Sequence, residues 1–125
     1  MLSFQSKVDH GCLIVRDVGA EDDLTDWDPA DANWYRSGNS IIFGVMPGVE
    51  GPVQCAVFDE CPEPALPVVL ARQEISAPSR RLVVHDPNET VRFEFRVQAE
   101  VVELLLLVDD GDFASRVQIV STAAG

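Results

Sequence analysis

Residues 90–97 read Thr-Val-Arg-Phe-Glu-Phe-Arg-Val and form the most regular stretch of the sequence. Apolar side chains at Val91, Phe93, Phe95 and Val97 alternate strictly with charged side chains. Successive side chains of a β-strand point to opposite faces, so this alternation places one face on a core and the other in water. The stretch therefore predicts a half-buried β-strand.

Short runs rich in β-branched and aromatic residues recur on both sides of this strand, separated by turn-forming Pro, Gly, Asn and Asp. The runs predicted as further strands are 11–17, 40–46, 53–58, 68–75, 81–85, 101–108 and 115–121. No stretch shows a convincing helical period, and the composition of residues 21–32 favours a loop. We therefore predict an all-β fold, an antiparallel β-sandwich of about eight strands, as a single domain over residues 1–125.

The run Val101–Val108 is apolar almost throughout, and Glu103 is its one charged residue. Such a run is typical of a central strand that is covered on both faces. The second face of this strand needs another layer to cover it. One alternative function is therefore a structural protein that assembles into oligomers.

The composition is strongly acidic: 21 Asp and Glu stand against 9 Lys and Arg, for a net charge of −12. Such a surface repels nucleic acid and anionic membranes, and it attracts a basic protein. The cations at Arg72, Arg80 and Arg81 are too few to form a nucleic-acid patch. An acidic surface that serves only solubility is the simpler explanation of the charge.

The sequence also indicates a compartment. Residues 1–17 lack the apolar stretch of a signal peptide, and no apolar run is long enough to span a bilayer. Three cysteines are an odd number, which fits free thiols in a reducing environment. We expect a cytoplasmic protein.

The segment 18–39 between two predicted strands is long for a loop, and loops of this length are usually functional or disordered. Within it, residues 21–35 contain six carboxylates, two tryptophans and a tyrosine, with no Lys or Arg. Burying unpaired carboxylates is costly, so the loop must face solvent or a basic partner. The candidate partner-binding residues are Asp22, Asp23, Asp26, Trp27, Asp28 and Asp31.

Two interpretations of the aromatic residues remain open. Trp27, Trp34 and Tyr35 either cap the core or serve as contact anchors inside a charged rim, since interface centres favour Trp and Tyr. Both hold if Trp34 and Tyr35 pack on the core while Trp27 is exposed.

Signatures of catalysis are weak. His10 and Cys12 would share a strand face, but no oxyanion site or orienting third residue accompanies them, so we predict no enzyme.

Metal sites are also weakly indicated. The spacing along the chain is unusual for a zinc site made of His10, Cys12, Cys55 and Cys61. The acidic cluster at 22–31 and the cluster at 109–112 do not match the EF-hand calcium loop. We predict no metal and no cofactor, and a calcium- or carbohydrate-binding module remains an alternative.

Four runs carry a resemblance to a known family: Ser40–Gly44, Val53–Phe58, Arg81–His85 and Val101–Val108. Their order resembles the ComJ family, competence proteins that inhibit a DNA-entry nuclease, over roughly the central two-thirds of the chain. The family's late glycine-tyrosine strand entry is absent, because Glu100-Val-Val102 stands in its place. The resemblance implies a small acidic β-sandwich that binds and blocks a nuclease, and it assigns no individual site residue.

The sequence thus predicts a non-enzymatic, acidic protein-binding module. Its most concrete form is an inhibitor or immunity protein that blocks a basic enzyme such as a nuclease. In this hypothesis the carboxylates of the acidic loop steer a basic partner, and Trp27 fills a pocket on it.

Overall fold

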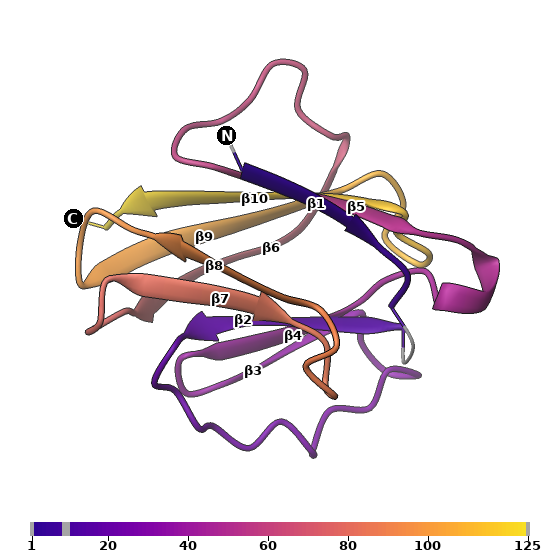
Figure 1. Ribbon diagram of the computed structural model, residues 1–125, viewed down its shortest axis with the longest axis horizontal. Helices are drawn as coiled ribbons and strands as arrows, with labels where there is room; N and C mark the ends of the chain where they lie inside the picture. The colour runs from indigo at the N-terminus through magenta and orange to yellow at the C-terminus, as the bar shows by residue number, and fades with distance from the viewer. Residues whose placement is uncertain (1, 9–10, 125) are drawn as a thin grey trace.

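A computed structural model describes residues 2–8 and 11–124. Its described part forms ten strands and one short 3-10 helix, η1 (Figure 1). The elements are β1 Leu2–Ser6, β2 Cys12–Asp17, β3 Trp34–Ser37, β4 Ser40–Gly44, η1 Gly48–Glu50, β5 Val53–Phe58, β6 Val68–Ser76, β7 Arg81–His85, β8 Arg92–Arg96, β9 Val101–Val108 and β10 Arg116–Ala123. None of these described elements is a helix long and apolar enough to cross a bilayer.

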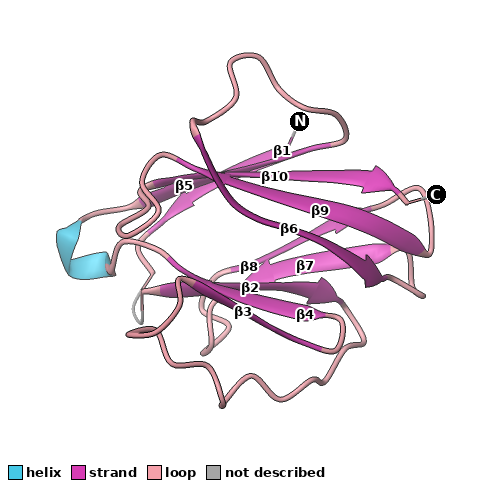
Figure 2. Cartoon of the chain, turned by 180° about the vertical axis from the view of Figure 1, so that it is seen from behind, coloured by secondary structure: helices cyan, strands magenta, loops and turns pink. Residues whose placement is uncertain are grey.

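The strands form two five-stranded sheets that face each other and do not close into a barrel (Figures 1 and 2). The first sheet has the order β1-β5-β10-β9-β6, and the second has the order β3-β4-β2-β7-β8. Pairing is antiparallel throughout except between β5 and β10, which run parallel. The predicted all-β class is therefore confirmed.

Two details of the predicted fold are wrong. The described chain has ten strands where the sequence predicts about eight, and the parallel β5–β10 pair means that the first sheet is not purely antiparallel. The additional strands are β1, which adds to the edge of the first sheet beside β5, and β3. Because β3 lies inside the segment 18–39 that the sequence predicts as one loop, the loop itself covers residues 18–33.

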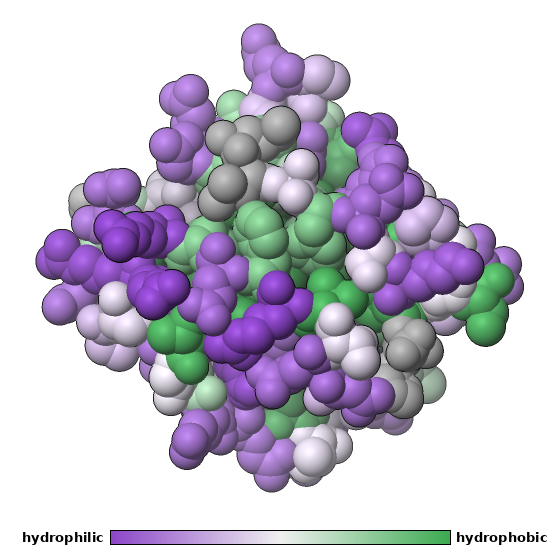
Figure 3. All heavy atoms as spheres, viewed as in Figure 1, coloured by the Kyte–Doolittle hydropathy of each residue, from purple (hydrophilic) through white to green (hydrophobic). Residues whose placement is uncertain are grey.

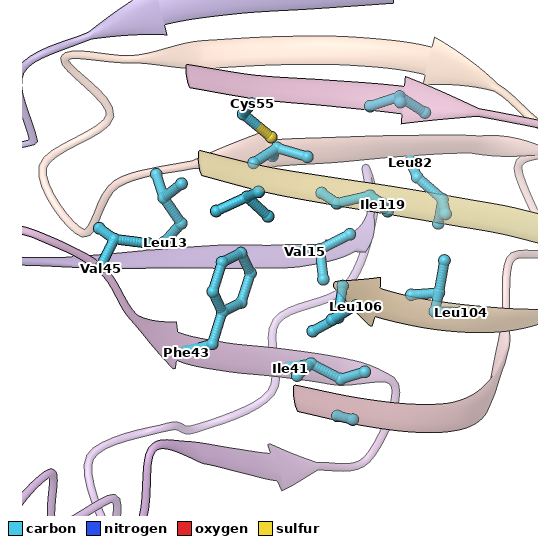
Figure 4. Close-up of a cluster of buried hydrophobic side chains, with 14 of the residues drawn as sticks. Leu13, Val15, Ile41, Phe43, Val45, Cys55, Leu82, Leu104, Leu106 and Ile119 are labelled. Atoms are coloured by element: carbon cyan, nitrogen blue, oxygen red, sulfur yellow. The ribbon is translucent and has the colours of Figure 1, made fainter. Parts of the chain in front are cut away.

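The main core lies between the sheets and is built from alternate residues of facing strands. Figure 4 shows Leu13, Val15 and Phe43 from the second sheet pointing towards Leu106 and Ile119 of the first. All five side chains are fully buried. Period two in each strand dictates this arrangement, because shifting the register by one residue would turn every apolar side chain to the other face.

The strand β9 is internal, as its apolar run predicts, and pairs with β10 on one side and β6 on the other. Its inner face joins the main core. On its outer face, Leu107 packs with Val120 of β10 and Leu66 of the connection 59–67. The chain thus covers this outer face at Leu107, whereas Val101 at the start of the strand is 39% exposed.

Candidate protein-binding surface

The residues 18–33, here called the acidic segment, lie across the outer face of the second sheet (Figures 1 and 2). A small apolar cluster holds the segment there. Its buried members, on β2 and β4, are Cys12, Ile14 and Ile42, and its partly buried members are Leu24, Trp27 and Tyr35. Leu24 and Trp27 therefore attach the acidic segment to the sheet by burying apolar surface.

A second attachment is polar. The Oδ2 atom of Asp22 accepts hydrogen bonds from the backbone N–H of Asn39 at 3.0 Å and from the hydroxyl of Ser40 at 2.8 Å. Both donors lie at the β3–β4 turn, so this carboxylate fixes the start of the segment to the hairpin. Asp22 is therefore partly buried and already engaged within the chain.

The middle of the segment is shaped by local hydrogen bonds. The carboxylate of Asp23 accepts hydrogen bonds from the hydroxyl of Thr25 at 2.6 Å and from the backbone N–H of Thr25 at 2.8 Å. Both bonds lower the pKa of Asp23, and the bond from the hydroxyl has the larger effect. The carboxylate of Asp28 accepts a bond from the backbone N–H of Ala30 at 2.9 Å. The indole Nε1 of Trp27 donates to the carbonyl of Ala32 at 3.0 Å. Such turns give the segment a defined conformation.

The six predicted partner-binding residues therefore differ in their surroundings. Asp23, Asp26, Asp28 and Asp31 are exposed, whereas Asp22 and Trp27 are partly buried. The carboxylates of Asp26 and Asp31 make no hydrogen bond or ion pair with other described residues, so they are available to a cation from outside. Of the aromatic pair Trp34 and Tyr35, the first packs on the main core and the second on the outer cluster.

A second acidic turn, residues 109–113, lies beside the acidic segment. The side-chain Nδ2 of Asn33 donates to Oδ1 of Asp112 at 3.4 Å. Asp109 holds the turn together, because its carboxylate accepts bonds from the hydroxyl of Ser115 at 2.6 Å and from three backbone N–H groups. Burial raises the pKa of Asp109, but these hydrogen bonds outweigh it and the pKa is lowered.

Between the two acidic elements lies a pocket of about 180 Å³. Its wall includes Trp27, Pro29 and Asn33 from the acidic segment, Gly44 from the end of β4, and Asp112 from the second turn. Phe113, directly after Asp112, is 46% exposed. The sequence shows two separate acidic clusters, and no pattern in it identifies Asn33 or Asp112 as neighbours of Trp27 in one pocket.

The two buried cysteines, Cys12 and Cys55, are poorly suited to nucleophilic chemistry. Burial, with a smaller contribution from Asp86, raises the pKa of Cys12 to about 11, and burial raises that of Cys55 to about 12. A thiol with such a pKa is protonated at neutral pH and is a weak nucleophile. His10, the proposed partner of Cys12, lies outside the described residues.

The structure places the three cysteines of the zinc hypothesis in different parts of the fold. Cys12 lies in the outer cluster of the second sheet, Cys55 lies in the main core, and Cys61 is exposed in the connection 59–67. Among the described residues, no group of three or more His, Cys, Asp or Glu side chains is arranged to hold a metal ion.

The charged outer face of β8 makes pairs within the chain, as cross-strand neighbours commonly do. Glu94 of β8 accepts from Arg81 of β7 at 2.9 Å and from Arg92 at 3.1 Å. Arg92 also pairs with Glu89 at 2.7 Å. Ion pairs within the chain therefore account for most of the charged side chains on this face, and no binding partner is needed to explain them.

Known proteins match this chain in fold and not in sequence. No protein-family model matches the chain, and no curated protein matches its sequence. Among solved structures, the chain is similar to a protein described as crocagin biosynthetic gene J, with a TM-score of 0.59 and 13% identity over 99% of this chain and 96% of that one.

The chain is more similar to ComJ from Bacillus subtilis, an inhibitor of the DNA-degrading activity of NucA. The TM-score is 0.74 at 8% identity, over 99% of this chain and 96% of ComJ. A likeness at such low identity concerns the fold and not the activity. The resemblance that strand order predicts is thus confirmed: the chain has a fold similar to that of ComJ.

Proposed function

We propose that this chain is a non-enzymatic, cytoplasmic inhibitor that binds a basic enzyme, most concretely a nuclease, through its acidic segment. One observation carries the proposal: the exposed carboxylates of Asp23, Asp26, Asp28 and Asp31 form a segment without cations, fixed on a sheet in a defined conformation. The likeness in fold to ComJ, an inhibitor of a nuclease, supports it.

The physical logic concerns the partner's charge. A nuclease binds phosphate, so its substrate cleft presents Lys and Arg, and an acidic surface complements that cleft. Carboxylates without partners in the free chain gain hydrogen-bonded cations in the complex. The fixed conformation of the segment reduces the entropy lost on binding. The partly buried Trp27 and the half-exposed Phe113 give the acidic surface apolar contacts, which interface centres favour.

The test begins with capture of partners from host lysate at low and at high salt, followed by identification by mass. The proposal expects a basic nuclease that is captured at low salt and weakened at high salt, because charge pairs across an exposed surface are screened. Purified chain should then inhibit that nuclease at equimolar concentration. Recovery of only the chain itself, or of a partner whose activity is unaffected, would contradict the proposal.

A matched pair of variants locates the surface. Asp26→Lys with Asp31→Lys reverses two carboxylates of the acidic segment. Glu60→Lys with Glu63→Lys makes the same change of net charge in the connection 59–67, which lies on the opposite side of the molecule (Figure 1). Loss of inhibition in the first variant alone supports the acidic segment as the site. Equal loss in both would reduce the effect to net charge.

A further inference from the structure

We infer that the pocket between the acidic segment and the second acidic turn receives an arginine side chain of the protein partner. This inference rests on the proposed function and gives it a specific contact. The composition of the pocket carries the inference, because its lining joins an indole, a carboxylate and a glycine from three separate parts of the chain.

The indole and the carboxylate define the chemistry. Trp27 and Asp112 both line the pocket. The side chain of Asp112 has one long hydrogen bond, from Asn33 at 3.4 Å, and it makes no ion pair within the described chain. A cation beside a tryptophan ring is attracted by the ring's quadrupole, and a carboxylate adds a charge-assisted hydrogen bond. Such a pocket prefers a cation that has a flat apolar face.

The guanidinium group meets this requirement better than an ammonium group. It is planar, it is weakly hydrated, it stacks on aromatic rings, and it donates hydrogen bonds in a fork that matches a carboxylate. The pocket volume of about 180 Å³ is below that of sites for drug-sized ligands, which start near ~300 Å³. It suits the end of a single side chain.

The glycine in the lining of the pocket supplies an independent test. Gly44 lines it, and a Cβ added there would lie 3.8 Å from the carbonyl oxygen of Asn33 and 4.0 Å from that of Gly11. These are ordinary van der Waals distances, so Gly44→Ala fills space in the pocket without forcing the backbone to move. The variant changes no charge, and it separates the shape of the pocket from the electrostatic field of the acidic surface.

The experiment uses N-acetyl-arginine amide as a probe and follows the two indole N–H signals of the intact chain by NMR. The indole of Trp27 should shift in a saturable manner, while that of Trp34, which packs on the main core, should not. N-acetyl-citrulline amide, which has a similar shape but no charge, should produce no saturable shift. Asp112→Asn and Gly44→Ala should each weaken binding of the arginine probe about fivefold. Glu60→Gln, in the connection 59–67, should leave it unchanged.

Several results would overturn the inference. They are an unresponsive Trp27, an equal response to citrulline, tighter binding of the corresponding lysine amide, or equal effects of Asp112→Asn and Glu60→Gln. No nuclease is present in this experiment, so it fails or succeeds separately from the proposed function. A responding pocket in a chain that inhibits no nuclease would leave the pocket standing and remove the inhibitor proposal. A chain that inhibits a nuclease but whose Trp27 does not respond to the probe would leave the inhibitor proposal standing and remove the pocket.

Discussion

The rings of Phe4 and Phe93 lie with their centroids 5.5 Å apart, and they join the first strand of one sheet to the last strand of the other. Both β1 and β8 are edge strands, so this tilted aromatic pair bridges the two sheets along one side. Along the other side, Nη1 of Arg36 on β3 donates to Oε1 of Gln73 on β6 at 3.0 Å. Each open side of the two-layer fold thus has a side-chain bridge.

Removal of the aromatic bridge should destabilise the chain. Phe4→Ala deletes a partly buried ring and its contact with Phe93, which predicts a loss of about 1–3 kcal/mol in the free energy of unfolding. Urea denaturation would measure the loss. Val69→Ala is the control, because Val69 is 60% exposed and its truncation should change stability by less than about 0.5 kcal/mol. Equal stability of the two variants would show that the ring pair does not secure the edge.

The attachment of the acidic segment depends on a glycine. Gly38 has φ +56°, and a Cβ added there would lie 2.2 Å from Oδ1 of Asp22. Gly38→Ala must therefore displace that carboxylate from Asn39 and Ser40, and it also adds about 1 kcal/mol of backbone strain. We expect a loss of about 2–3 kcal/mol in the free energy of unfolding.

A double-mutant cycle separates the clash from the strain. In an Asp22→Ala background, Gly38→Ala should cost only the backbone term, about 1 kcal/mol, because the carboxylate is already gone. Additive losses would mean that Asp22 and Gly38 do not interact. The readout is again the free energy of unfolding.

The strands that the sequence predicts are those with strong local patterns. The alternation over 90–97 became β8, and the apolar run 101–108 became β9 with the same bounds. The missed strand β1, Leu2–Ser6, is short and half polar, so it exists through its pairing with β5 and not through its composition. The sequence does not predict β3, because the acidic residues before it made the whole segment resemble a loop. The dipeptide Gly38-Asn39 between the paired residues Ser37 and Ser40 is nevertheless a recognisable hairpin turn.

The candidate surface was predictable only in part. Exposure of the carboxylates at Asp26 and Asp31 follows from the cost of burying unpaired charge, which the composition already reveals. The partial burial of Trp27 does not follow, because it depends on the outer face of β2 and β4 being apolar. The proximity of Asn33 and Asp112, which are 79 residues apart, arises from strand topology, and no local pattern encodes it.

The three thiols should differ sharply in reactivity. Cys61 is exposed, whereas Cys12 and Cys55 are buried with pKa values raised to about 11 and about 12. At pH 8, a disulfide reagent such as Ellman's should therefore react rapidly with one thiol and with all three only after unfolding. In Cys61→Ser the rapid phase should disappear. Rapid reaction of a second thiol in the folded chain would contradict the burial of Cys12 or Cys55.

Stability should fall in acid partly because of Asp109. Its pKa is lowered in the folded chain relative to the ordinary value near ~3.9, since the hydrogen bonds from Ser115 and Arg116 outweigh burial. A lowered folded pKa means that the group stabilises the fold above the unfolded pKa, and that this contribution is lost as the pH falls through the folded pKa. Asp109→Asn should therefore cost about 1–2 kcal/mol at pH 7 and less near pH 3. A loss independent of pH would contradict the role of the charge.

The proposed partner surface predicts different kinetic effects for its charged and aromatic residues. Asp26→Asn with Asp31→Asn should slow association with a basic partner severalfold at low salt, and this effect should shrink at high salt, because exposed charges act mainly on encounter. Trp27→Phe should instead speed dissociation, since it removes the indole bond to Ala32 and part of the ring that lines the pocket. Both rates can be measured by biolayer interferometry at two ionic strengths.

Glu60→Gln with Glu63→Gln is the matched control for this last prediction, because it removes the same charge from the connection 59–67. Its association rate should fall less than that of the double variant in the acidic segment, since only long-range net charge is altered. Thermal unfolding of Trp27→Phe must accompany the kinetics, because Trp27 also covers Ile14 and Ile42. If dissociation is unchanged in a Trp27→Phe chain that is still folded, the indole holds the acidic segment on its sheet and does not contact the partner.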